Sequence, residues 1–137
     1  MTQEVLLRGL QDAVKAAVAA SIVPNWETEK RIAFIGVGFA LPADGKYLEV
    51  IDLPADGGWE AWGPQHQQLG ALRLILHWPQ GAPYEPKRVL ESIVSYFTKD
   101  RRFAAFKVAA VPSFSGVLAQ GSENLYPVTV RYQRFNN

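Results

Sequence analysis

The chain has 137 residues, of which 48% are hydrophobic and 20% are charged, and its formal net charge is +1. This length suits one domain with one core, so a single domain is expected over residues 1–137. The near-neutral charge argues against a protein that binds nucleic acid by neutralising phosphates, and the absence of cysteine excludes disulfides and thiolate metal sites.

The first twenty residues predict an amphipathic helix. Thr2 can cap its start, Glu4 suits its first turn, and Ser21 to Pro24 end it. Apolar residues recur at spacings of three and four, at Leu6, Leu10, Ala13, Val14, Ala17 and Val18. Charged residues interrupt this segment, so it predicts neither a signal peptide nor a membrane span, and we expect a soluble protein made in the cytoplasm.

Residues 31–41 (RIAFIGVGFAL) are apolar on both alternating faces. This pattern predicts a strand that is covered on both sides, and the second cover could be another subunit. Gly36 and Gly38 supply only part of a dinucleotide-binding fingerprint, because the third glycine is missing and no helix follows.

The motif LPADG occurs twice, at residues 41–45 and 53–57. Proline presets φ and glycine accepts a positive φ, so both copies predict turns. The turns bracket a predicted strand at residues 46–52, which we expect to form a hairpin with the strand before it. The aspartates here, Asp44, Asp52 and Asp56, lack the ligand spacing of a calcium loop.

Residues 55–67 form a predicted loop that contains Trp59 and Trp62. Structureless connections of this length are uncommon in compact domains and tend to be functional or mobile. The two tryptophans pack either on their own domain or in an interface, and the sequence leaves both possibilities open.

The clearest strand and helix follow one another. Residues 72–78 alternate, with Arg73 and His77 on the polar face and Leu72, Leu74, Leu76 and Trp78 on the apolar face. A proline-rich break then leads to Pro86, which suits the first turn of a helix. The apolar stripe of that helix comprises Val89, Leu90, Ile93, Val94 and Phe97.

The C-terminal part predicts two more strands. One is short, at residues 107–111, and a second long loop at residues 112–124 separates it from the other, at residues 125–135. The last strand alternates, and its apolar face carries Tyr126, Val128, Val130 and Tyr132.

The sequence shows no reaction centre. It lacks a nucleophile elbow, a phosphate loop and an H-E-x-x-H motif, and its only histidines are His66 and His77. Two histidines without further ligands at suitable spacing do not predict a zinc site. We therefore expect a protein that is not an enzyme and that has no cofactor or metal.

Several phrases of the sequence resemble the tail-terminator or tail-completion proteins of long-tailed bacteriophages. The resemblance covers residues 2–135, and its motifs are structural rather than catalytic. They are Pro24-Asn25-Trp26 after the first helix, Pro-Ala-Asp-Gly-Lys-Tyr-Leu-Glu-Val at residues 42–50 leading to Asp52-Leu53-Pro54, Gly-Ala-Leu-Arg-Leu at residues 70–74 leading to Trp78-Pro79-Gln80-Gly81, and Leu125-Tyr126-Pro127-Val128.

The resemblance implies a single α+β domain, with a mostly antiparallel sheet of about five strands and two helices packed on one face. It implies a homohexameric ring that caps the tail tube at the tail-head junction of the virion. The partners would be further copies, the tail tube protein and the head-connector protein, while DNA passes through the lumen without specific binding and no membrane is involved. Subunit or partner contacts are then expected at Ile35, Val37, Phe39, Trp59, Trp62 and His66.

Two alternatives remain open on the sequence. One is a different head-tail joining protein, such as a connector or stopper, which would differ in ring size and partner. The other is a small-molecule-binding α+β module, or an enzyme of an unrecognised kind, with a pocket lined by Trp59, Trp62 and His66.

Overall fold

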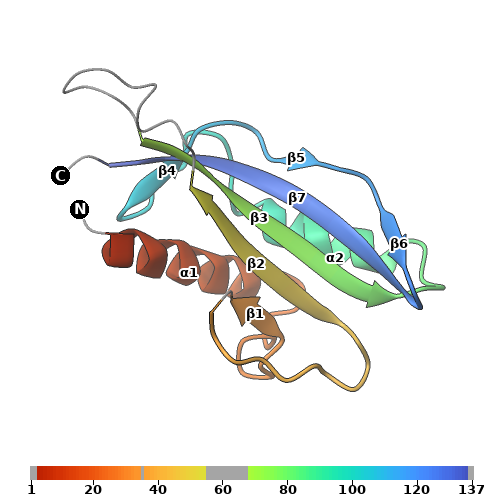
Figure 1. The fold of residues 1–137 in the computed structure, drawn as a ribbon. Coiled ribbons are helices and arrows are strands. Elements are labelled where there is room, and N and C mark those ends of the chain that lie inside the picture. The colour runs from red at the N-terminus through yellow and green to blue at the C-terminus, as the bar shows by residue number, and fades with distance from the viewer. Residues whose placement is uncertain (1–2, 35, 55–67, 136–137) are drawn as a thin grey trace.

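The computed structural model describes residues 3–34, 36–54 and 68–135 of the chain. Within these residues the chain forms two helices and a single sheet of seven strands (Figure 1). In chain order the elements are α1 (Gln3–Ala19), β1 (Ile32–Phe34), β2 (Tyr47–Pro54), β3 (Gln68–Pro79), α2 (Glu85–Val94), β4 (Phe106–Val108), β5 (Ser113–Phe114), β6 (Leu118–Gln120) and β7 (Glu123–Arg134).

The sheet is mixed, with the strand order β1-β2-β3-β7-β4, and β5 and β6 also pair with β7. β1 runs parallel to β2, and every other pairing is antiparallel. The predicted α+β class and the mostly antiparallel sheet are therefore confirmed, although the described part of the sheet has seven strands rather than about five.

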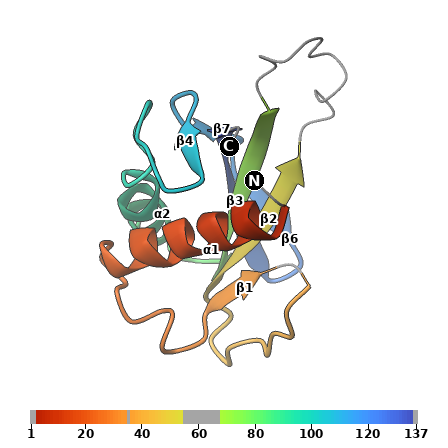
Figure 2. The same cartoon turned by 90° about the vertical axis from the view of Figure 1, so that its left-hand side faces the viewer.

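Both helices cover the same face of the sheet (Figures 1 and 2). Every residue of the predicted α1 stripe is buried, because a helix with apolar residues at spacings of three and four can bury that side completely. α2 carries Pro86 in its first turn and ends at Val94, three residues before the predicted end. Phe97 is nevertheless fully buried, because a tight turn follows the helix, with the Phe97 N–H donating to the Val94 carbonyl at 2.9 Å.

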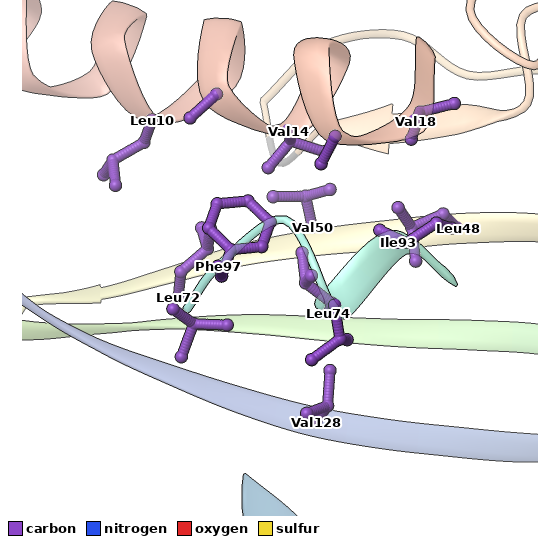
Figure 3. Close-up of a cluster of buried hydrophobic side chains, with 14 of the residues drawn as sticks. Leu10, Val14, Val18, Leu48, Val50, Leu72, Leu74, Ile93, Phe97 and Val128 are labelled. Atoms are coloured by element: carbon purple, nitrogen blue, oxygen red, sulfur yellow. The ribbon is translucent and has the colours of Figure 1, made fainter. Parts of the chain in front are cut away.

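The core lies between these helices and the covered face of the sheet. Val50, Leu74 and Val128 are paired across β2, β3 and β7, so they form one row beneath α1 and α2 (Figure 3). The predicted apolar faces of β3 and β7 are confirmed, since Leu72, Leu74, Leu76, Trp78, Tyr126, Val128, Val130 and Tyr132 are all buried.

A second feature of the covered face is the close approach of Tyr132 to Gly70. The two residues are paired between β7 and β3, and a Cβ on Gly70 would overlap the Tyr132 ring. The ring therefore lies flat against the glycine, and its hydroxyl donates a hydrogen bond to Asp52 Oδ1 at 2.8 Å. Burial, together with that bond, raises the pKa of the Tyr132 phenol well above its ordinary value.

The predicted strand at residues 31–41 is wrong in its length. Only Ile32–Phe34 form a strand, and the described residues 36–41 are turn and irregular structure. Gly36 has a φ of 83°, in the left-handed region that a β-strand does not use. Gly36 therefore prevents the strand from continuing, and residues 36–41 form a loop.

The predicted hairpin between this strand and residues 46–52 is also wrong. The turn itself forms, because Gly45 has a φ of 73° and its N–H donates to the Pro42 carbonyl at 3.1 Å. It lies inside a twelve-residue connection, and β1 returns parallel to β2, with Ile32 opposite Leu48. Twelve residues are enough for a crossover that brings the chain back to the end where β1 began, so that β2 runs in the same direction. Most of the second LPADG copy lies outside the described residues.

The predicted loop at residues 112–124 contains strands that the sequence did not indicate. β5 pairs with Thr129 and Val128 in the middle of β7, and β6 pairs with residues 123–125 at the start of β7. The predicted strand at residues 107–111 is shorter than expected, since β4 ends at Val108. Strands of two or three residues leave no periodic pattern, and their pairing depends on β7.

Candidate functional site

The structure describes two of the six predicted contact residues. Val37 is 59% exposed and Phe39 is partly buried, both in the irregular segment after β1. Ile35, Trp59, Trp62 and His66 lie outside the described residues. The expectation that these six residues contact another subunit stays a prediction.

The segment around Val37 is unusual for a solvent-facing loop. Residues 36–43 read GVGFALPA and contain no polar side chain, yet Val37 and Leu41 are 59% and 72% exposed. We refer to residues 36–45 as the edge loop, since they lie beside β1 at the free edge of the sheet (Figure 1). Contiguous exposed apolar surface of this kind is typical of a contact site.

Phe39 fixes the edge loop to the sheet. Its ring lies 5.1 Å from the ring of Tyr47 on β2, measured between centroids. Tyr47 in turn stacks on His77 of β3, with centroids 4.1 Å apart and ring planes only 9° from parallel. The three rings form a continuous series of contacts from the loop across β2 to β3, so the loop has a defined position.

Two carboxylates contact His77, the third of these rings. Glu49 Oε1 lies 2.8 Å from His77 Nε2, and Glu123 Oε1 lies 3.3 Å from His77 Nδ1. His77 is only 7% exposed, so the polar face on which the sequence placed it is covered at this position. Burial, and then the charges of Glu123 and Glu49, raise the pKa of Tyr47. Each ring nitrogen of His77 lies beside a carboxylate oxygen, which fixes the orientation of the ring.

Arg31 binds the C-terminal end of the edge loop. Its guanidinium donates to Glu29 at 2.7 Å, to Asp44 at 2.7 Å and to the Lys46 carbonyl at 2.9 Å. The bond from Arg31 lowers the pKa of Asp44 below its ordinary value, and the same bond raises the pKa of Arg31. Arg31 therefore ties the C-terminal end of the edge loop to the segment that precedes β1.

The opposite edge of the sheet carries a second apolar surface. Between α2 and residues 111–118 lie two cavities of about 270 and 410 Å³ that share Glu91 and Phe114 in their walls. We refer to these adjoining cavities as the α2 groove. Its apolar walls include Leu90, Val94, Val111, Phe114, Val117 and Tyr126.

The outer wall of the α2 groove is exposed but firmly attached. Phe114 pairs with Val128 in β5, and the Ser115 N–H donates to the Pro127 carbonyl at 3.2 Å. Phe114 is nevertheless 55% exposed, and Val111, Val117 and Leu118 are exposed as well. The sequence analysis missed this surface. The reasoning applied to tryptophans in the first long loop, that an aromatic in a loop needs a surface to contact, would have identified Phe114 in the second.

Neither a metal site nor a membrane helix is found where the structure can be described. Across residues 3–34, 36–54 and 68–135, no cluster of three or more histidine, aspartate or glutamate side chains is arranged to hold a metal ion. In the same residues, neither helix is both long and apolar enough to span a bilayer.

Comparison with known proteins gives similarity in fold but not in sequence. No protein-family model matches the chain, and neither does any curated protein. One solved structure, whose name describes no function, has a TM-score of 0.78 and 17% identity, and the match covers 100% of this chain and 98% of that one. A chain from the virion of a native gene transfer agent (GTA) particle has a TM-score of 0.62 and 12% identity, covering 93% of this chain and 96% of that one. At identities this low, the two matches show a shared fold and no more.

Proposed function

We propose that the protein is a virion structural protein of a phage-type particle. The observation that carries this proposal is the fold match to a chain from a gene transfer agent virion, which extends over 93% of this chain and 96% of the other. A match over nearly the full length of both chains concerns the whole domain rather than a common motif. The sequence phrases that resemble tail-terminator proteins support the same class.

Within that class, we propose a ring of six copies that caps the tail tube at the junction with the head connector. Two apolar surfaces at different edges of one sheet support a ring, because a heterologous contact between them repeats from copy to copy and closes by rotation. The net charge of +1 suits a lumen through which DNA slides without specific binding. The protein would act by assembly and not by catalysis.

The mass and shape of the purified protein test this proposal. Light scattering coupled to gel filtration should give about six times the chain mass of 15.2 kDa, and negative-stain images should show rings. Added to tail tubes of the same virus, the protein should appear at one end of each tube. A particle that stays a single chain at high concentration, and that does not bind tube ends, would contradict the proposal.

A further inference from the structure

We infer that the edge loop of one copy docks into the α2 groove of the next copy. The inference rests on the proposed assembly of copies and names the surfaces that form the contact. The inserted side chains are Val37 and Leu41, and the receiving wall is formed by Phe114 and Val117.

The two surfaces match in chemistry. Residues 36–43 carry no charged or polar side chain, so their burial leaves no side-chain hydrogen-bonding group without water or a partner. The α2 groove is also lined largely by apolar residues; of its charged groups, Lys87 and Glu91 belong to α2 and Lys99 to the segment that follows it. Long side chains of this type can keep their charges in solvent while their stems remain in the apolar wall.

The edge loop cannot reach the groove of its own chain. The strand order runs from β1 through β2, β3 and β7 to β5, which is four strand-to-strand steps. At the usual spacing the two edges are about 19 Å apart, and Figure 1 shows β1 and β5 at opposite edges of the sheet. The edge loop can therefore enter only the groove of another molecule, and each copy of this chain offers both halves of the contact.

Both halves are already held in shape in the single chain. The edge loop is anchored through Phe39 to Tyr47 and its C-terminal end is bound by Arg31, while the groove wall is attached to β7 by backbone hydrogen bonds. Little conformational freedom is lost when two such surfaces meet, which favours a specific contact over a loose one. A contact between different edges leaves one free loop and one free groove on every pair, so copies continue to add until the ring closes.

Paired charge substitutions test the inference. One variant carries Phe114→Asp and Val117→Asp in the groove, and the other carries Val37→Asp and Leu41→Asp in the loop. Each alone should lose assembly and have the mass of one chain. Mixed in equal amounts, they should form a dimer and nothing larger, because one intact loop meets one intact groove and no second contact is available.

Val5→Asp is the matched control, since Val5 is an exposed valine on α1 that lines neither surface. This control should assemble like the wild-type protein, and circular dichroism should show that all variants keep the fold. If Phe114→Asp disturbs β5, Val117→Asp alone reports on the groove, because it lies outside that strand.

The outcomes separate this inference from the proposed function. Wild-type rings together with unchanged assembly of either double variant would overturn the docking contact and leave the ring intact. A loop variant that still forms dimers by itself would also overturn it, because that result requires two grooves to meet. Rings from the groove variant that no longer bind tail tubes would assign the groove to the tube protein instead. A monomeric wild-type protein would overturn both proposals.

Discussion

The covered face of the sheet and the two edges of the sheet both carry large apolar side chains, but only the first buries them. On the covered face, Leu74 and Val128 are fully buried beneath two helices. At the edges, Leu41 and Val111 are each 72% exposed. Leucine and valine are therefore buried where the helices of this chain cover the sheet, and exposed where no helix covers them.

The covered face is expected to contribute to the free energy of folding, and the edges to the free energy of assembly. A fully buried aliphatic side chain stabilises the folded chain by about 1.5–3 kcal/mol, and this is the contribution of the covered face. The edge residues gain little of it in a single chain, and only an added molecule would supply the rest. Substitutions in the two regions should then separate stability from assembly.

The largest contrast is expected between Leu74→Ala and Phe114→Ala. Leu74→Ala should lower the free energy of unfolding by about 2–5 kcal/mol, because it leaves a cavity in the core. Phe114→Ala should lower it by about 1 kcal/mol or less, because that ring is half exposed. Urea denaturation measures both, and equal losses would show that the groove wall belongs to the core.

A smaller contrast in stability is expected between alanine substitutions at two glycines. Gly70→Ala should cost about 1–3 kcal/mol, because the new Cβ meets the Tyr132 ring and that ring is packed on all sides. Gly38→Ala in the edge loop should change stability by no more than about 0.5 kcal/mol, because no atom lies within 4 Å of the new methyl group. Unaltered denaturation midpoints for both variants would contradict the packing described for Tyr132.

Tyr132→Phe probes the polar contact on the covered face. At pH 7 the loss should be about 1 kcal/mol, since Asp52 loses its hydrogen-bond donor. The pKa of Tyr132 is raised in the folded state, so its contribution is fully present below the ordinary value of 10 and is lost as the pH rises further. The difference between wild type and variant should therefore narrow above pH 10 in denaturation experiments. A constant difference from pH 7 to about pH 11 would argue against this bond.

The smallest effect on stability is expected for Asp44→Asn in the edge loop. Arg31 and Asp44 form an exposed ion pair, which typically contributes about 0.2–1 kcal/mol. The pKa of Asp44 is lowered in the folded state, so this contribution is present above the ordinary value of 3.8 and disappears as the pH falls below it. Hydrogen exchange of residues 36–45 should quicken in the variant at pH 7 while the denaturation midpoint barely moves. Unchanged exchange would show that the pair does not hold the loop.

The sequence predicted the covered half of the fold well. Local periodicity located α1, α2 and the buried faces of β3 and β7, down to Leu72 and Tyr126. These patterns are readable because an element that is buried on one side repeats its apolar residues with the period of its own backbone. Even so, the apolar spacing predicted a helix up to Phe97, three residues beyond the end of α2, because Phe97 is buried in the turn that follows the helix.

The candidate surfaces were predicted only in part. The apolar segment that contains Val37 and Phe39 was identified correctly as unusual, but it was taken for a long strand in a hairpin, whereas its strand stops at Phe34 and pairs in parallel. The groove was missed, because its walls come from α2 and residues 111–118, which meet only through their shared neighbour β7. The carboxylates beside His77 were not predicted, because Glu49 and Glu123 are 28 and 46 residues away in the chain.

The sequence by itself thus determined which segments are helices, which long strands have a buried face, and that apolar residues are available beyond those the core needs. The tertiary structure decided where that surplus lies, at two different edges of one sheet, and that a buried histidine and an arginine hold one of the two surfaces in place. The physical reason is that periodicity is a property of neighbouring residues, whereas strand direction, sheet order and groove walls depend on contacts between residues far apart in the chain.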